Sequence, residues 1–174
     1  PLGKRLRYGA EAALFFSLVG FFRILGIDAA SAVGGFIGRT LLYRTGATRR
    51  ARENMMAAFP EKSAADIEKL LVAMWDNLGR TAAEYAHFDK FSLSGRNPRL
   101  TVLNRHRSDA AFENGKGVLL FSGHLANWEI MPFAMQQCGY ETGEVYRPVN
   151  NPFVNGWIVS RRASSGPPEQ IAKG

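Results

Sequence analysis

The feature that most constrains the fold of this chain is a short apolar run that is followed, after one serine, by a glycine and a histidine. The run is Val118-Leu-Leu-Phe121, and Ser122-Gly123-His124 comes directly after it. Consecutive apolar residues without polar alternation are typical of a strand buried on both faces, as in a parallel sheet. Gly123 permits a tight exit from such a strand. We therefore expect His124 at the carboxyl edge of the sheet, where open α/β sheets place their ligand sites.

The residues on either side of this run predict alternating strands and helices. The expected elements are strands at 100–103, 118–121 and 140–146, and helices at 108–114 and from about 128 to 137. Asn127 or Trp128 can cap the second helix, and Pro132 then falls in its first turn, where proline is tolerated. Strand, helix and strand in succession predict an α/β fold with a mostly parallel sheet layered with helices.

The amino-terminal part predicts helices instead. Residues 9–58 are rich in apolar and small residues, and Gly34, Gly35 and Gly38 would let a second helix approach closely. A break at Phe59-Pro60 and a capping pattern at Ser63 predict a further helix over about 64–87. The expected division is a basic, apolar, membrane-docking helical region over 1–58 and the α/β domain over 59–174.

The charge of the chain supports this division. Residues 1–52 hold nine Lys and Arg against two Asp and Glu, and subtracting these from the totals of 22 and 15 leaves thirteen of each sign. All of the net charge of +7 thus lies in the first third. The arginines alternate with aliphatic side chains, which argues against nucleic acid as a partner. The single cysteine, Cys138, excludes an internal disulfide and favours a reducing compartment.

An apolar run lies between these basic residues. It covers Ala12 to Phe22, which is shorter than the ~20 residues that a spanning helix needs. Positive residues flank it on both sides, and the positive-inside tendency places both flanks in the cytoplasm. We expect a shallow helical anchor on an anionic membrane surface, or a helix pair dipping into it, over a span through Arg23 and Asp28. Core helices of a soluble protein are the alternative.

His124 and Glu129 form the candidate catalytic pair. A strand–loop–helix junction can bring the two side chains together. An imidazole held by a carboxylate on one nitrogen keeps the other nitrogen free to accept a proton, and a substrate hydroxyl can then act as the nucleophile. The alternative is a buried structural ion pair. We expect no metal, because no third ligand stands at a familiar spacing from this pair.

The segment Gly123-His124-Leu-Ala-Asn127-Trp128-Glu129 resembles the signature of the bacterial lipid A biosynthesis acyltransferases, which are lauroyl and myristoyl transferases of the lysophospholipid acyltransferase superfamily. Further matches are distributed from about residue 10 to residue 162. They are Arg52-Glu-Asn54, Ala58-Phe-Pro60, Asn77-Leu-Gly-Arg80 with Glu84, Val145-Tyr-Arg-Pro148 and Asn151-Pro152.

The resemblance implies transfer of a fatty acyl chain, usually from acyl carrier protein, to a hydroxyl of a lipid A precursor at the cytoplasmic face of the inner membrane. It implies that 59–174 is the amino-terminal part of a glycerolipid acyltransferase-like domain. His124 and Glu129 match the catalytic pair, and no cofactor beyond the acyl thioester is expected. Arg147 is expected to hold phosphate or acceptor groups, which suits a guanidinium.

Three further substrate-binding candidates also have simpler explanations. Asn127 is also a helix cap candidate, and Arg80 and Glu84 are spaced as an i, i+4 surface ion pair. Two alternative functions stay open: a related lysophospholipid or glycolipid acyltransferase that uses acyl-CoA, and a non-catalytic lipid-surface binding module in which the His–Glu pair is structural.

Overall fold

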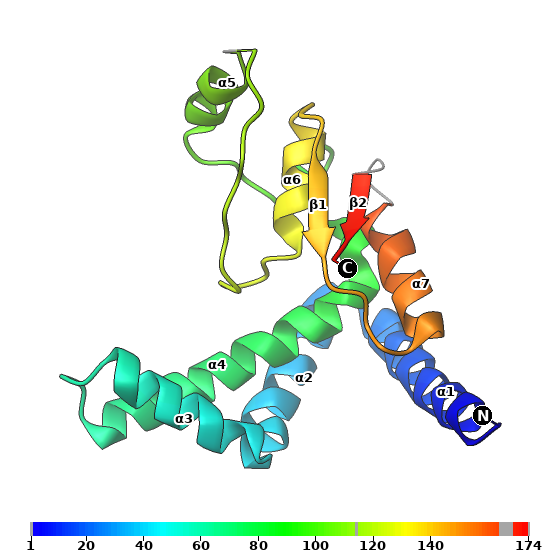
Figure 1. The fold of residues 1–174 in the computed structure, drawn as a ribbon, viewed down its shortest axis with the longest axis vertical. Helices are drawn as coiled ribbons and strands as arrows, with labels where there is room; N and C mark the ends of the chain where they lie inside the picture. Colours follow the sequence, from blue (N-terminus) through cyan, green and yellow to red (C-terminus); the bar gives the residue numbers. More distant parts are fainter. Residues whose placement is uncertain (1, 114, 164–168, 174) are drawn as a thin grey trace. The chain divides into compact units, whose positions relative to one another are not determined.

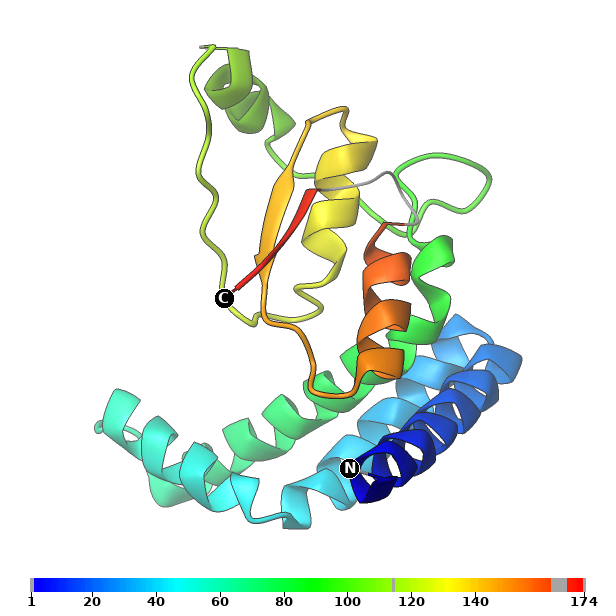
Figure 2. The same cartoon turned by 45° about the vertical axis from the view of Figure 1, so that its right-hand side comes forward.

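The computed structural model describes residues 2–113, 115–163 and 169–173, which form two compact units (Figures 1 and 2). One unit is Val19–His87, and the other combines Pro1–Leu18 with Phe88–Gly174. The elements in chain order are α1 (Leu2–Leu25), α2 (Ile27–Thr40), η1 (Leu42–Arg44), α3 (Ala47–Ala58), α4 (Ala64–Glu84), η2 (Tyr85–Lys90), α5 (Arg105–Glu113), α6 (Ile130–Gln137), β1 (Gly143–Tyr146), α7 (Pro152–Arg162) and β2 (Glu169–Ala172).

The helical unit is built on close contact between α2 and α4, which lie side by side in both views. A Cβ added to Gly79 would lie 2.1 Å from the carbonyl oxygen of Gly34, and one added to Gly38 would lie 2.0 Å from that of Trp75. Only glycine allows the two backbones to approach this closely. The small-residue seam predicted at Gly34, Gly35 and Gly38 is therefore confirmed, as is the cap at Ser63, whose side chain accepts from the Asp66 N–H.

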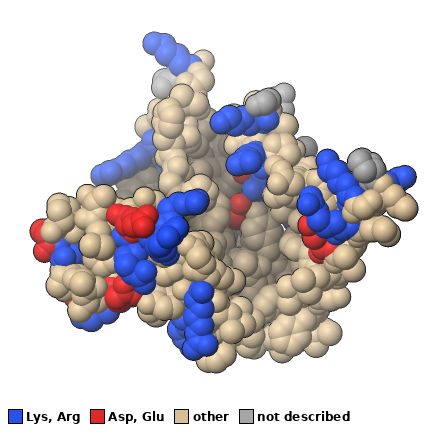
Figure 3. Space-filling view, turned by 60° about the horizontal axis from the view of Figure 1, so that its bottom comes forward, with Lys and Arg blue, Asp and Glu red and all other residues tan. Residues whose placement is uncertain are grey.

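Charged residues of this unit pair with one another. Arg39 and Arg80 both contact the carboxylate of Asp76, and Arg52 on α3 forks onto Glu68 on α4. In the space-filling view, acidic side chains accordingly lie directly against basic ones (Figure 3). Part of the positive charge in the first third of the chain is thus neutralised locally.

Helix α1 extends well beyond the apolar run seen in the sequence. It has 24 residues and includes the basic residues on both flanks of the run, so its length is about 36 Å at ~1.5 Å per residue. By length and composition it could cross a membrane, and only 6% of its apolar window is buried. The apolar helix is therefore longer than the eleven-residue run in the sequence suggested.

The α/β unit holds a two-stranded sheet. β1 and β2 are parallel, with Gly143 opposite Glu169 and Tyr146 opposite Ala172, and α7 makes the crossover between them. The parallel α/β arrangement and the helices α5 and α6 are confirmed. β2 was not predicted from the sequence, because Glu169-Gln-Ile-Ala172 has little strand propensity and becomes a strand by pairing with β1.

Two of the three predicted strands are wrong. Residues 100–103 and 118–121 form no strand, and Leu119 and Phe121 are 78% and 87% exposed. A strand is held by backbone hydrogen bonds to a neighbour. In the described ranges β1 and β2 pair only with each other, and no strand lies beside either segment. The apolar composition of 118–121 thus identified a hydrophobic segment but not its backbone state.

Helix α7 is fixed at its amino-terminal end. The Asn151 side chain caps α7 by accepting from the Phe153 N–H, and its amide donates to the Tyr8 carbonyl at 2.8 Å and to Glu11 Oε2 at 3.1 Å. Next to this contact, Trp157 packs edge-on against Phe15, with ring centroids 5.2 Å apart. The first half of α1 therefore determines the position of α7 within this unit.

The glycine seam gives a direct stability test. Gly79→Ala should lower the free energy of unfolding by roughly 2 kcal/mol, because its Cβ would overlap the Gly34 carbonyl and force α2 and α4 apart. Gly20→Ala is the matched control, since Gly20 also lies within a helix but has no neighbour within 4 Å. That change should raise the free energy of unfolding by about 0.5–1 kcal/mol. Equal effects of the two substitutions in urea denaturation would contradict the close packing.

Candidate active site

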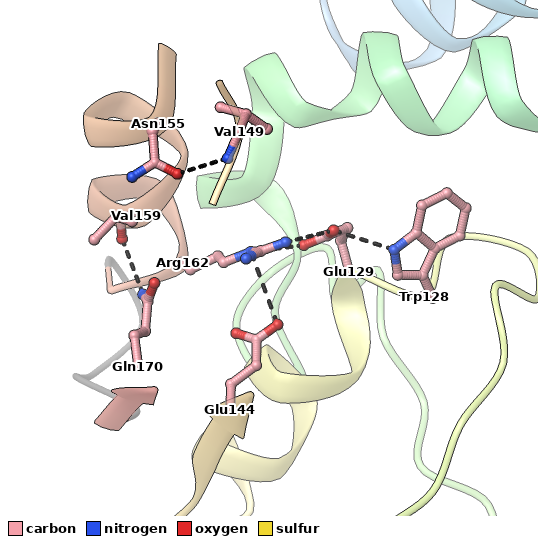
Figure 4. Close-up of polar contacts among 8 residues, drawn as sticks. All are labelled: Trp128, Glu129, Glu144, Val149, Asn155, Val159, Arg162 and Gln170. Atoms are coloured by element: carbon pink, nitrogen blue, oxygen red, sulfur yellow. Dashed lines mark hydrogen bonds and ion pairs between the residues drawn. The ribbon is translucent and has the colours of Figure 1, made fainter. Parts of the chain in front are cut away.

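Glu129 is a buried carboxylate with three hydrogen-bond donors. It is 7% exposed and stands directly before α6. Arg162 donates from Nε to Glu129 Oε2 at 2.9 Å and from Nη2 to Oε1 at 2.8 Å, and the Trp128 indole donates to Oε1 at 3.1 Å (Figure 4). This two-pronged contact is the strongest geometry for an arginine–carboxylate pair, and it fixes the plane of the carboxylate.

Arg162 reaches Glu129 from the last turn of α7, and its side chain is only 12% exposed. Sequence reasoning did not select this residue. Arg161 and Arg162 end a helix, and basic residues in the last turn of a helix are favourable there without any partner. The signal that could have pointed to Arg162 is Glu129 itself, because a carboxylate that is buried in a fold requires a partner.

His124 lies at the centre of a tight turn. The Leu125 N–H donates to the Gly123 carbonyl at 2.8 Å, which closes a three-residue turn around His124. Two residues later, Ala126 has a φ of 47°, a conformation that costs a non-glycine residue about 1–2 kcal/mol. His124 itself is exposed. A strained turn of this kind is characteristic of functional loops.

Trp128 contacts both members of the predicted pair. Its ring packs edge-on against the His124 imidazole, with centroids 4.7 Å apart, and its N–H donates to Glu129. In the described part of the chain no hydrogen bond joins His124 directly to Glu129. The structure thus brings both residues into contact with one indole ring. Sequence reasoning considered Trp128 only as a helix cap and missed this bridge.

Glu144 is a second carboxylate near Arg162. It lies on β1, and its Oε1 is 3.8 Å from Arg162 Nε. Burial raises the pKa of Glu144 above its ordinary value, and the negative charge of Glu129 adds to this, while Arg162 acts in the opposite direction. The buried centre of the candidate site therefore consists of one guanidinium and two carboxylates.

The other predicted site residues lie in less enclosed surroundings. Arg147 directly follows β1 and is exposed, and within the described ranges it forms no ion pair, so its guanidinium is accessible.

Asn127 does not cap α6. The helix begins at Ile130 with Glu129 as N-cap residue, and the Asn127 carbonyl accepts from the Ile130 N–H at 3.2 Å. The expected cap at Asn127 or Trp128 was wrong because α6 begins later than its sequence pattern suggested.

Arg80 and Glu84 belong to the helical unit. Arg80 pairs with Asp76 one turn earlier on α4, and this contact is the main reason that the pKa of Asp76 is lowered. Glu84 accepts a hydrogen bond from Ser31 on α2 at 2.7 Å. Both residues thus take part in the contact between α2 and α4, and a role in substrate binding stays a prediction.

Comparison with known proteins assigns a family to this arrangement. Residues 4–168 match the family model described as bacterial lipid A biosynthesis acyltransferase. No curated protein and no solved structure showed a significant match. The family match includes every residue of the candidate site, from His124 through Arg162.

The ion pair between Arg162 and Glu129 can be tested by a double-mutant cycle. Arg162→Met should cost on the order of 3 kcal/mol of folding stability, because it leaves a buried charge without its partner. Adding Glu129→Gln should recover a large part of this loss, since the uncompensated charge is then removed. Arg147→Met, at an exposed arginine, should change stability by less than about 0.5 kcal/mol. An Arg162→Met variant as stable as Arg147→Met would contradict the assigned pair.

Proposed function

Because the chain belongs to the bacterial lipid A biosynthesis acyltransferase family and is therefore an acyltransferase, we propose that it transfers a fatty acyl group from an acyl thioester to a hydroxyl of a lipid A precursor. His124 is the general base in this proposal, and Glu129 orients it. The observation that carries the proposal is the buried Glu129 carboxylate, which is fixed by Arg162 and connected through Trp128 to the exposed His124.

The reaction needs one proton to move twice. The His124 imidazole takes the proton of the acceptor hydroxyl, and the oxygen attacks the thioester carbonyl. When the tetrahedral intermediate collapses, the carbon–sulfur bond breaks and the imidazolium returns the proton to the leaving thiolate. A carboxylate near the imidazolium stabilises its positive charge between the two transfers. The products are the ester and the free thiol.

Glu129 retains the capacity for this role although Arg162 holds it. A carboxylate has about four acceptor positions on its two oxygens, and Arg162 and Trp128 use three of them. The remaining position is on Oε2, which accepts only the Arg162 Nε–H. A movement of the strained turn around His124 would be needed to bring the imidazole to this position. The exposure of His124 leaves room for such a movement.

Acyl carrier protein is the donor that we favour, with acyl-CoA as the alternative. The chain has a net charge of +7, and long-range attraction accelerates the encounter of a basic enzyme with an acidic carrier protein. Figure 3 shows that many basic groups lie next to acidic ones, so the attraction depends on the basic residues that stay exposed, such as Lys4 and Arg5. Arg147, exposed directly after β1, is the group that we assign to the phosphate or acceptor groups of the lipid.

Helix α1 is the element that we assign to membrane association on the cytoplasmic face. Leu14, Leu18 and Phe21 recur at helical spacing and are 65%, 45% and 47% exposed. Lys4, Arg5 and Arg7 lie in its first two turns, where they can contact anionic head groups. An apolar face with basic residues at its end is the pattern of a helix that lies in the membrane interface.

The catalytic role of His124 is tested by its removal. His124→Ala should reduce transfer of a labelled acyl group to a lipid A precursor by at least about 100-fold, the usual scale of general-base catalysis. His106→Ala is the matched control, because His106 is also exposed but lies on α5, and it should keep full activity. A donor panel of acyl carrier protein and CoA thioesters separates the two donors. Full activity of His124→Ala with any donor contradicts the mechanism.

Membrane docking by α1 is tested with vesicles. Leu14→Gln combined with Leu18→Gln should weaken binding to vesicles that contain anionic phospholipid by at least about 100-fold, since each buried aliphatic side chain contributes roughly 1.5–3 kcal/mol. The control is Leu103→Gln with Leu119→Gln, at leucines that are 80% and 78% exposed outside α1. Added salt should weaken binding of the parent chain. If both double variants lose the same amount of binding, α1 is not the docking element.

A further inference from the structure

Arg162 lies near two carboxylates but donates hydrogen bonds to only one of them, Glu129. Its Nε has a single hydrogen, which it donates to Glu129 Oε2 at 2.9 Å. Glu144 Oε1 is 3.8 Å from the same nitrogen, which is beyond hydrogen-bond distance. In Figure 4 the Glu144 side chain projects from β1 toward the guanidinium that holds Glu129. The two acids therefore share one positive charge, although Glu129 has the hydrogen bonds.

Glu144 is the less satisfied of the two acids. Its side chain is 22% exposed, and its Oε2 is buried with no hydrogen-bond partner in the described part of the chain. The charged groups that face it are Arg162 from α7 and Glu129 from the residue before α6, while β2 presents the neutral Gln170 opposite it. Tyr146, on the same strand, stacks against Arg162 at 5.5 Å. Burial without a hydrogen bond favours the neutral form of a carboxylic acid, so these surroundings favour protonation of Glu144.

We propose that Glu144 is a positioning residue that controls, through Arg162, how much negative charge Glu129 presents to His124. The proposal rests on the proposed function of His124 and Glu129. It adds a third ionisable group to the site, which acts on the imidazole only through the guanidinium and Glu129.

The two protonation states of Glu144 differ in the charge that surrounds Glu129. When Glu144 is protonated, Glu129 is the one of these two acids that carries a charge opposite to that of Arg162. When Glu144 is ionised, one guanidinium faces two carboxylates, and the three groups together carry one net negative charge. Charge interactions are strong at such partly buried sites, so Glu129 then stabilises an imidazolium at His124 more effectively.

The direction of the pH dependence follows from this difference. The pKa of Glu144 is raised by burial, so its ionisation occurs at a higher pH than that of an ordinary glutamate, which is about 4.3. The transfer rate should increase as pH rises through this ionisation. The acid limb of the pH profile of kcat should therefore contain the ionisation of Glu144.

The test compares Glu144→Gln with Glu141→Gln. Glu141 is an exposed acid three residues earlier, so its substitution removes the same charge without touching Arg162. The parent chain and Glu141→Gln should both show this ionisation on the acid limb. Glu144→Gln should lack it and reach a plateau about tenfold lower, because less of the positive charge that develops on the base is stabilised. Glu144→Asp should restore the ionisation. A Glu144→Gln profile of the same shape as the parent profile overturns the proposal.

A second measurement does not depend on turnover. Carbon-13 NMR of the full chain with labelled glutamate carboxyl groups should show one carboxyl that titrates above the ordinary glutamate range, is absent in Glu144→Gln and is kept in Glu141→Gln. Its absence from the parent spectrum overturns the proposal even if Glu144→Gln does not fold. Failure of the proposed function is distinguishable, because it appears as activity in His124→Ala, whereas failure of this inference leaves His124→Ala inactive.

Discussion

The buried ion pair between Glu129 and Arg162 is the interaction on which the arrangement of the candidate site depends. A carboxylate at 7% exposure needs a partner, and the partner comes from the far end of α7. The near end of α7 is held by Asn151 and Trp157 against the first half of α1. The helix assigned to membrane docking and the carboxylate of the candidate site are thus connected through one eleven-residue helix. A disturbance of α1 in this unit would therefore be transmitted to Glu129 as a change in its hydrogen bonds.

The same pair also explains how a single histidine could be used for acyl transfer. Glu129 cannot rotate while two nitrogens of Arg162 and the Trp128 indole hold it, so its remaining acceptor position has a fixed direction. His124 contacts the same indole from an exposed turn that precedes the strained Ala126. Preorganisation of the carboxylate reduces the reorganisation needed during the proposed reaction. Glu144 adds control of charge to this fixed geometry.

The sequence predicted most of the features that depend on local chemistry. The Ser63 cap was predictable because a capping hydrogen bond acts over a few residues. The three glycines of α2 predicted close approach of another helix because they lack a Cβ, but they did not predict that this helix is α4. The pairing of Glu129 with Arg162 was not predictable, because it joins residues 33 positions apart. The strand expected at 118–121 failed for a related reason. Apolar composition predicted a buried strand, but a strand and its burial both require neighbours, which are set by the whole fold, and Leu119 and Phe121 are exposed.

The central claim is that Glu129 orients His124 during acyl transfer. It is tested most directly by NMR of the Nδ1–H proton of His124 in the presence of a non-hydrolysable acyl thioester analogue. The account predicts a proton resonance shifted strongly downfield by a hydrogen bond to the carboxylate, which disappears in Glu129→Gln while the fold is retained. A His124 resonance that is the same in the parent chain and in Glu129→Gln would contradict the account.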